Sequence, residues 1–199
     1  MKNLRNLLAK IDKELDGLSY TANDRNNFSA ALFDVAIEHS KGIIVLFENS
    51  LYASGYALAR PVFESFIRAA WLQLCASDEQ VAQVKKKDEF PLSLGQMLEA
   101  VETTKSWPCT LSNIKDIALK NMHSYTHGGM QLVARRFKNG ELIHAIDSGE
   151  IDELKKFVAL IAFLSFNNIV ILSKNNDKDD FIKEIYEDIC KWCFPKSEQ

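Results

Sequence analysis

The chain has 199 residues and a mass of 22.6 kDa, enough for one well-packed hydrophobic core, and we predict a single helical domain over residues 1–199. Hydrophobic residues make up 47% and charged residues 26%, as in an ordinary globular protein, so a largely disordered chain is excluded. The formal net charge of −3 argues against a protein that coats nucleic acid non-specifically, because such binding depends on an excess of Lys and Arg; a local basic site remains compatible with it.

Apolar residues recur at spacings of three and four along most of the chain, a pattern typical of helices. We therefore predict an all-α fold, a single bundle of about six to seven helices. The first three predicted helices cover about residues 4–15, 23–46 and 50–76. Small residues fill the first half of the third helix and allow another helix to approach closely, and Pro61 is expected to interrupt its middle.

Two further helices are predicted in the middle of the chain. Ser93 and Gln96 have the spacing of a capping box, which predicts that a short helix follows them. The next helix is predicted over about residues 110–127, because Gly128 and Gly129 then stop it.

Residues 131–146 are the one segment in which the sequence favours strands. Asn139 and Gly140 form a hairpin turn signal there, so we expect a loop or one small β-hairpin. Asp147 and Glu150 then have the spacing of a capping box and predict the start of a long apolar helix.

The most apolar stretch of the chain is residues 157–172, inside that long helix. It is shorter than the roughly 20 residues of a membrane span and contains Asn167 and Asn168, so we interpret it as a buried core helix whose amides need partners. The charged start of the chain lacks the apolar segment of a signal peptide. We therefore expect a cytoplasmic protein that does not enter membranes, with a last amphipathic helix over about residues 179–193.

The first concentration of unusual chemistry is the sequence Arg60-Pro61-x-x-Glu64-x-x-x-Arg68. Residues four apart lie on one face of a helix, so Glu64 can hold either guanidinium in a fixed pose. A fixed guanidinium is a good ligand for a phosphate or a carboxylate, which makes the three charged residues predicted ligand-binding residues. The alternative is an ion pair on the solvent face that contributes only a few tenths of a kcal/mol.

The second concentration is residues 120–129, in which Lys120, His123 and His127 share one helix face. His127 falls at the predicted helix C-terminus, where the helix dipole favours a protonated ring, and the glycines that follow allow a ligand to approach the backbone. The alternative is that His127 only caps the last carbonyl groups while Tyr125 fills the core.

The spacing of His123 and His127 also resembles a helical metal pair. A third ligand would have to come from Glu64, His39 or His144, and the glutamate of an H-E-x-x-H motif is replaced by a serine. A metal-dependent hydrolase is therefore a minor alternative, and the preferred prediction involves neither a metal nor another cofactor.

Arg135 and Arg136, with Lys138 nearby, form the third basic group. They follow the glycines closely enough to form a phosphate-binding loop, and we count them and Tyr125 among the predicted ligand-binding residues. The alternative is an ordinary solvated turn.

The motifs described above resemble those of a known family. The segments 58–68 (LARPVFESFIR) and 124–129 (SYTHGG), followed by Arg135 and Arg136, resemble a family of uncharacterised bacterial helical proteins over most of the chain. That family is distantly similar to the HEPN superfamily (higher eukaryotes and prokaryotes nucleotide-binding).

Many HEPN proteins are metal-independent ribonucleases of toxin and phage-defence systems. Their signature is an Arg, often followed by a polar residue, and a His four to six positions later, on one helix of a dimer. In this chain Lys120 and Asn121 precede His127 at the longest of those spacings, six positions counted from Asn121. Lysine for arginine is a departure, because a point charge replaces a planar fork, and Arg60 or Arg68 would then supply the guanidinium.

The resemblance implies roles for these residues. His127 would act as general acid or base on the ribose 2′-hydroxyl or the leaving oxygen. Lys120 and Arg60 would stabilise the charge on the phosphorane, while His123 and Asn121 orient the scissile phosphate. It also implies a homodimer that acts on RNA or binds a nucleotide.

A second class of function uses the same arginines without catalysis. A sensor or scaffold would use Arg60 and Arg68 as clamps for an anionic small ligand or a partner protein. We call Arg60, Glu64 and Arg68 the arginine row. The sequence leaves open whether the arginine row and the histidines lie close together in space, and a composite site requires that they do.

Overall fold

The computed structural model describes residues 2–107, 111–113, 124–143 and 146–193. The fold is all-α with one tiny two-stranded sheet, as the sequence predicts. Residues 111–113 and 124–126 are also helical, and both fall within the range 110–127 predicted for a helix. The elements with described bounds are α1 (Lys2–Leu15), α2 (Asp24–Glu48), α3 (Tyr52–Leu74), α4 (Asp78–Lys87), α5 (Leu94–Lys105), α7 (Met130–Ala134), β1 (Phe137–Lys138), β2 (Glu141–Leu142), α8 (Ser148–Ser173), a 3-10 turn (Asn176–Lys178) and α9 (Asp179–Cys193).

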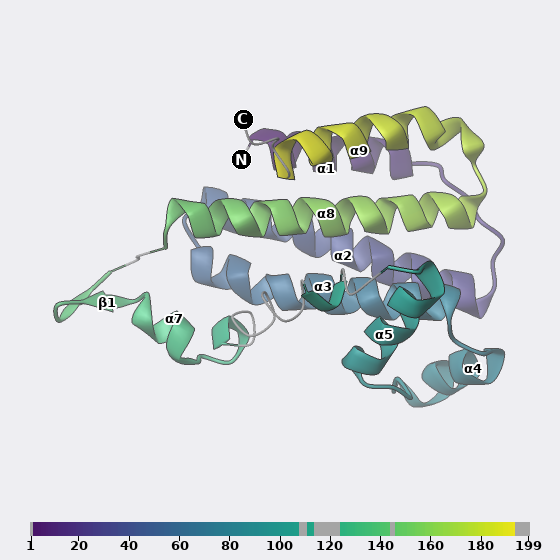
Figure 1. Cartoon of the computed structure of the whole chain (residues 1–199), viewed down its shortest axis with the longest axis horizontal. Helices are drawn as coiled ribbons and strands as arrows, with labels where there is room; N and C mark the ends of the chain where they lie inside the picture. The colour runs from purple at the N-terminus through teal and green to yellow at the C-terminus, as the bar shows by residue number, and fades with distance from the viewer. Residues whose placement is uncertain (1, 108–110, 114–123, 144–145, 194–199) are drawn as a thin grey trace.

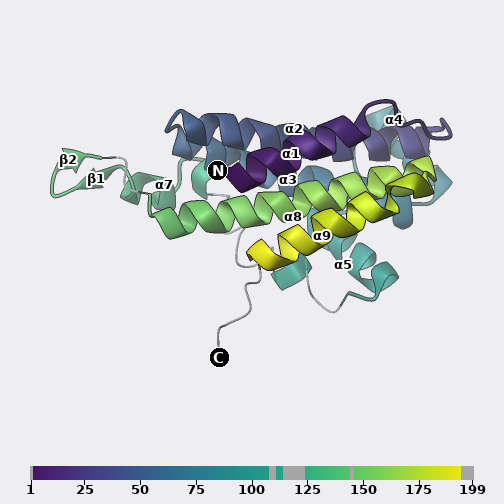
Figure 2. The same ribbon diagram turned by 90° about the horizontal axis from the view of Figure 1, so that it is seen from above.

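Three long helices, α2, α3 and α8, form the centre of the bundle (Figure 1). The most extensive contact joins α2 to α3, and α8 packs on both. The short helices α1 and α9 cover α8, whereas α5 packs on α3 (Figures 1 and 2). Helix α7 and the hairpin extend beyond the end of the bundle at which α3 begins (Figure 1).

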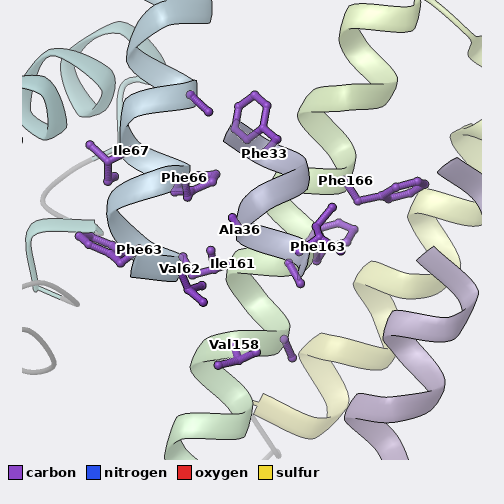
Figure 3. Packing of buried hydrophobic residues seen from close by; sticks show 14 of the residues in the cluster. Phe33, Ala36, Val62, Phe63, Phe66, Ile67, Val158, Ile161, Phe163 and Phe166 are labelled. Carbon is purple, nitrogen blue, oxygen red and sulfur yellow. The ribbon is translucent and has the colours of Figure 1, made fainter. Parts of the chain in front are cut away.

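The core consists of apolar side chains that these three helices direct toward one another (Figure 3). Phe33 of α2 and Phe66 of α3 meet with their ring centroids 5.9 Å apart. Each helix contributes apolar residues at spacings of three and four, which is why the sequence pattern identified all three. The other fully buried core residues labelled in Figure 3 include Ala36, Val62, Phe63, Ile67, Val158, Ile161 and Phe166.

The close approach of α2 and α3 depends on the small residues predicted to allow it. A Cβ atom added at buried Gly55 would lie 2.6 Å from Cδ1 of Phe47, which leaves no space for a methyl group. At Gly42, on the other helix, an added Cβ would lie 3.3 Å from the flexible end of Leu58.

We therefore expect Gly55→Ala to lower the free energy of unfolding by about 1–2 kcal/mol. Overpacking costs about 1–3 kcal/mol and outweighs the roughly 0.5–1 kcal/mol that alanine gains over glycine inside a helix. Gly42→Ala is the matched control, because Leu58 can move aside, and it should be neutral or slightly stabilising. Urea unfolding of both variants tests the pair, and equal effects at the two positions would contradict the close approach at Gly55.

Pro61 does not interrupt α3, which runs unbroken from Tyr52 to Leu74. Its ring has no N–H, so the carbonyl of Ala57, four residues earlier, loses its helical hydrogen bond. The prediction of an interruption was wrong, and the freed carbonyl finds a partner elsewhere, as described below.

Two elements were not predicted. Helix α4 begins at the N-cap Ser77, whose hydroxyl accepts from the Gln80 N–H, while the Gln80 side chain accepts from the Ser77 N–H. This capping box is readable in the sequence and was overlooked. Helix α7 has only five residues, too short for a periodic signal. The small hairpin is confirmed, with Asn139 and Gly140 at positive φ in its turn.

The start of α8 differs in part from the prediction. The Asp147 side chain accepts from the Gly149 N–H at 2.7 Å and is the N-cap, as expected. Glu150 does not complete a capping box, because its carboxylate binds the Arg135 guanidinium instead. The Arg135 guanidinium, at the end of α7, therefore binds the Glu150 carboxylate in place of the backbone N–H of the N-cap residue, which a capping box would use.

The apolar composition of α8 follows from its central place. Among the described residues it is the one helix long and apolar enough to cross a membrane by length and composition, and 56% of its most apolar stretch is buried inside the bundle. Asn168 is buried, and its side-chain amide donates to the Leu164 carbonyl at 2.8 Å. Buried packing against the other long helices accounts for its composition.

Candidate functional site

The arginine row on α3 has the geometry that its spacing predicts. Arg60 Nε donates to Glu64 Oε1 at 2.6 Å, and Arg68 Nη2 lies 3.4 Å from Glu64 Oε2. The Glu64 side chain is only 19% exposed, so this is a half-buried pair of contacts rather than an ion pair on an open solvent face. One carboxylate thus fixes two guanidinium groups, and the three side chains together carry one net positive charge.

Arg68 has a second neighbour. Its guanidinium carbon lies 5.1 Å above the centroid of the Phe90 ring, a cation–π arrangement. Arg68 is therefore held between Glu64 and an aromatic face, which leaves it less free to turn toward a ligand.

The segment 124–129 forms a helix end that requires both of its glycines. Gly128 has a φ of +69°, and the Gly129 N–H donates to the Ser124 carbonyl at 2.7 Å, the arrangement of a left-handed helix terminus. A Cβ at Gly129 would lie 2.5 Å from Ser124 Oγ, which itself accepts from the Gln131 N–H at the start of α7. His127, within this terminus, is exposed.

A hydrogen bond joins this helix end to α3. Thr126 Oγ1 donates to the Ala57 carbonyl at 3.4 Å, the same carbonyl that Pro61 leaves without its helical partner. The proline of the first motif thus creates the acceptor that the threonine of the second motif uses.

A stacked pair of tyrosines reinforces this contact. The rings of Tyr56 and Tyr125 lie with their centroids 4.6 Å apart and an angle of 20° between their planes. Tyr56 stands four residues before Arg60, so the row of residues spaced by four on α3 begins one turn earlier than the charged residues. The helix end that carries His127 therefore docks on the face of α3 that continues to Arg60 and Glu64.

Tyr125 also lies beneath a guanidinium. The Arg135 guanidinium carbon is 5.6 Å from the centroid of the Tyr125 ring, and Arg135 Nε donates to Glu150 Oε2 at 3.0 Å. A second nitrogen of Arg135 donates to the other oxygen of Glu150, so the pair is bidentate. Arg135 is consequently held in place by α8, and the alternative of a freely solvated turn does not apply to it.

A cleft of about 70 Å³ opens beside these residues, at the start of α3. Tyr125, Arg135 and Arg136, three of the predicted ligand-binding residues, line it together. Its other walls are the first residues of α3, the two residues that precede them, and two apolar side chains from later in the chain. These residues are Tyr52, Ala53, Ser54, Ser50, Leu51, Leu132 and Ile146.

A family model matches residues 33–196, which include both motifs and the whole cleft. The chain belongs to DUF6988, a family of unknown function. Comparisons with curated proteins and with solved structures gave no match.

Several predicted residues of this DUF6988 protein lie outside the described residues. They are Lys120, Asn121, His123 and His144. Within the described part of the chain, no group of three or more His, Cys, Asp or Glu side chains is arranged to hold a metal ion. The metal alternative depends on His123 and therefore stays a prediction without a structural test.

Among the residues missed in the sequence are Tyr56 and Glu150, which contact the predicted Tyr125 and Arg135. Tyr56 was readable, because the spacing of four that links Arg60, Glu64 and Arg68 extends back to it. Glu150 was not readable as a partner of Arg135, because its local spacing favoured a helix cap and only the fold brings the two together.

Proposed function

We propose that this protein is HEPN-like and acts on RNA as a metal-independent ribonuclease, or binds a nucleotide, in the cytoplasm and as part of a toxin or phage-defence system. The observation that supports the proposal most is the hydrogen bond from Thr126 to the carbonyl freed by Pro61. Together with the Tyr56–Tyr125 stack, it makes the arginine row and the helix end of His127 neighbours on one face. In this proposal the Arg60 guanidinium and the His127 imidazole act on the same phosphodiester, and these are groups that its cleavage uses.

In this proposal His127 transfers the proton. It is exposed at the end of a helix, so a substrate can reach the imidazole ring. Arg60, held by Glu64, stabilises the charge that develops on the phosphoryl oxygens. Lys120 would add a second positive charge, while Asn121 and His123 would orient the scissile phosphate, and two copies of the chain would form the active dimer.

The test of this site is the Arg60→Ala variant with purified protein and single-stranded RNA. The expected result is an affinity for RNA that falls by about tenfold or more, because a charge-assisted hydrogen bond contributes about 1.5–3 kcal/mol. EDTA should leave any cleavage unchanged. Lys10→Ala is the charge-matched control, since Lys10 pairs with Glu184 between α1 and α9, which lie on α8 rather than on α3. Equal losses in the two variants would mean that only net charge matters and would contradict a specific site.

A non-enzymatic sensor or scaffold is the second candidate. It is favoured by Glu64, which holds both Arg60 and Arg68 as a preset clamp and needs no proton-transfer group. This function predicts that an anionic ligand raises the melting temperature in a manner that depends on Arg60, with no turnover of RNA by the unmodified protein.

A further inference from the structure

One face of α2 is apolar although the core does not bury it. The residues of this face recur at spacings of three, four and seven, which places them on one side of the helix. All of them are exposed or half-buried, and Val45 is 55% exposed. The face consists of Ala31, Leu32, Val35, Glu38, His39, Val45 and Leu46, and we call it the outer stripe of α2.

The other described helices pack on the remaining sides of α2. Its buried residues belong to the core that it shares with α3 and α8. Helix α1 meets α2 along another side, where Lys41 Nζ donates to Asp12 Oδ1 at 2.8 Å. Helices α5 and α9 lie on the opposite side of the bundle from α2 (Figure 2). A long apolar face left open in this way is typical of a contact surface between proteins.

The order of side chains along the outer stripe is self-complementary in size. A two-fold axis perpendicular to α2 would bring an antiparallel copy of the helix onto it, so that residues on one side of the axis meet those on the other side. With the axis between Glu38 and His39, the apolar pairs that meet are Leu32 with Val45 and Ala31 with Leu46. In each pair a larger side chain meets a smaller one, which favours close packing.

The charged groups at the centre of the outer stripe are complementary as well. Glu38 is exposed and His39 is half-buried. The ion pairs that α2 makes within the described part of the chain involve its ends and Lys41, not Glu38 or His39. In the antiparallel pair each Glu38 carboxylate faces the imidazole of the partner's His39, so the same contact forms twice. Like charges at this place would repel each other, so a neighbouring acid and base allow the helix to meet its own copy.

We infer that the outer stripe of α2 is the interface of a homodimer, in which two copies of α2 pack antiparallel about a two-fold axis between Glu38 and His39. A different protein would need an acid and a base in the reverse order, whereas a second copy of this chain supplies them by symmetry. A homodimer is part of the proposed function, and the inference rests on that function for the role of the dimer in RNA cleavage. The interface itself involves neither Arg60 nor His127.

The test is sedimentation equilibrium of the full chain without RNA, at about 1–100 µM protein. The unmodified protein should approach twice the 22.6 kDa mass of one chain as its concentration rises. Glu38→Lys places a lysine opposite the partner's His39, and His39→Glu places a glutamate opposite the partner's Glu38. Each single variant should raise the dissociation constant of the dimer at least about tenfold. The double variant restores opposite charges across the axis and should return the constant to within about threefold of its original value.

A second pair of variants tests the apolar part of the interface. Val45 is exposed in one copy, so Val45→Lys should leave the fold intact, which circular dichroism checks, but it should raise the dissociation constant about tenfold because it lies opposite the partner's Leu32. Ile171→Lys is the matched control, since Ile171 is 52% exposed on α8, outside the outer stripe. Its dissociation constant should not change.

Three results would overturn the inference. They are a monomer at every concentration, a dimer that neither Glu38→Lys nor Val45→Lys weakens, and a double variant as weak as the single ones. In the first case the outer stripe would be left for a helix of another protein. RNA cleavage enters none of these measurements, so a dimer of this kind without any ribonuclease activity would contradict only the proposed function, and the two proposals fail separately.

Discussion

Replacing His127 with alanine is expected to lower the rate of RNA cleavage by about 10²–10⁴-fold, the usual contribution of a positioned general acid or base. The side chain is exposed at the helix end and lies outside the hydrophobic core, so the melting temperature should hardly change. The measurement is a single-turnover cleavage assay, with the circular dichroism spectrum recorded for each variant.

The control for this prediction is His127→Gln. Glutamine keeps a polar side chain of similar reach but cannot exchange a proton near neutral pH, so it should be as inactive as alanine. If His127→Gln cleaves RNA at the rate of the unmodified protein, His127 does not transfer a proton and the catalytic part of the proposal is wrong. The arginine clamp of α3 would then stand as a binding site alone.

Replacing Phe66 with alanine is expected to lower the free energy of unfolding by about 3–5 kcal/mol, a large share of the stability of a domain of this size. Phe66 is 1% exposed and packs against Phe33 where α2, α3 and α8 meet (Figure 3). The loss combines the transfer free energy of the ring with the cavity that it leaves. Urea unfolding gives the value directly.

Phe137→Ala removes the same ring from an exposed place. Phe137 lies on the hairpin and is 51% exposed, so its replacement should change the free energy of unfolding by less than about 0.5 kcal/mol. Phe66→Leu should fall between the two variants, because most of the buried volume remains. A large effect of Phe137→Ala together with a small effect of Phe66→Ala would contradict the arrangement of the core.

The sequence predicted the long helices well because each one buries a periodic apolar face. Helix α9 begins and ends where its pattern does, at Asp179 and Cys193, and α8 begins directly after its N-cap Asp147. Helix α4 has just one buried residue, Val81, so periodicity could not show it and only its capping box could. Pro61 misled the prediction, because a tertiary contact compensates the backbone group that it leaves unpaired.

The site was predictable in its parts but not in its assembly. The spacing of four gave the Arg60–Glu64–Arg68 contacts correctly, since they are local to one helix. Nothing in the sequence indicated that the Glu150 carboxylate would bind Arg135 instead of capping the helix. That contact depends on where α7 lies. The docking of Thr126 on Ala57 is also a contact between distant segments, which only the fold reveals.

The claim at the centre of the proposal is that the arginine row and the helix end of His127 form one site. A double-mutant cycle for RNA binding, with Arg60→Ala, His127→Ala and the double variant, measures this directly. If both side chains contact the same phosphate, the double variant should lose less affinity than the two single losses combined, with a coupling of about 0.5–3 kcal/mol. Losses that add within about 0.3–0.5 kcal/mol would mean that the two groups act independently, and would contradict a composite site.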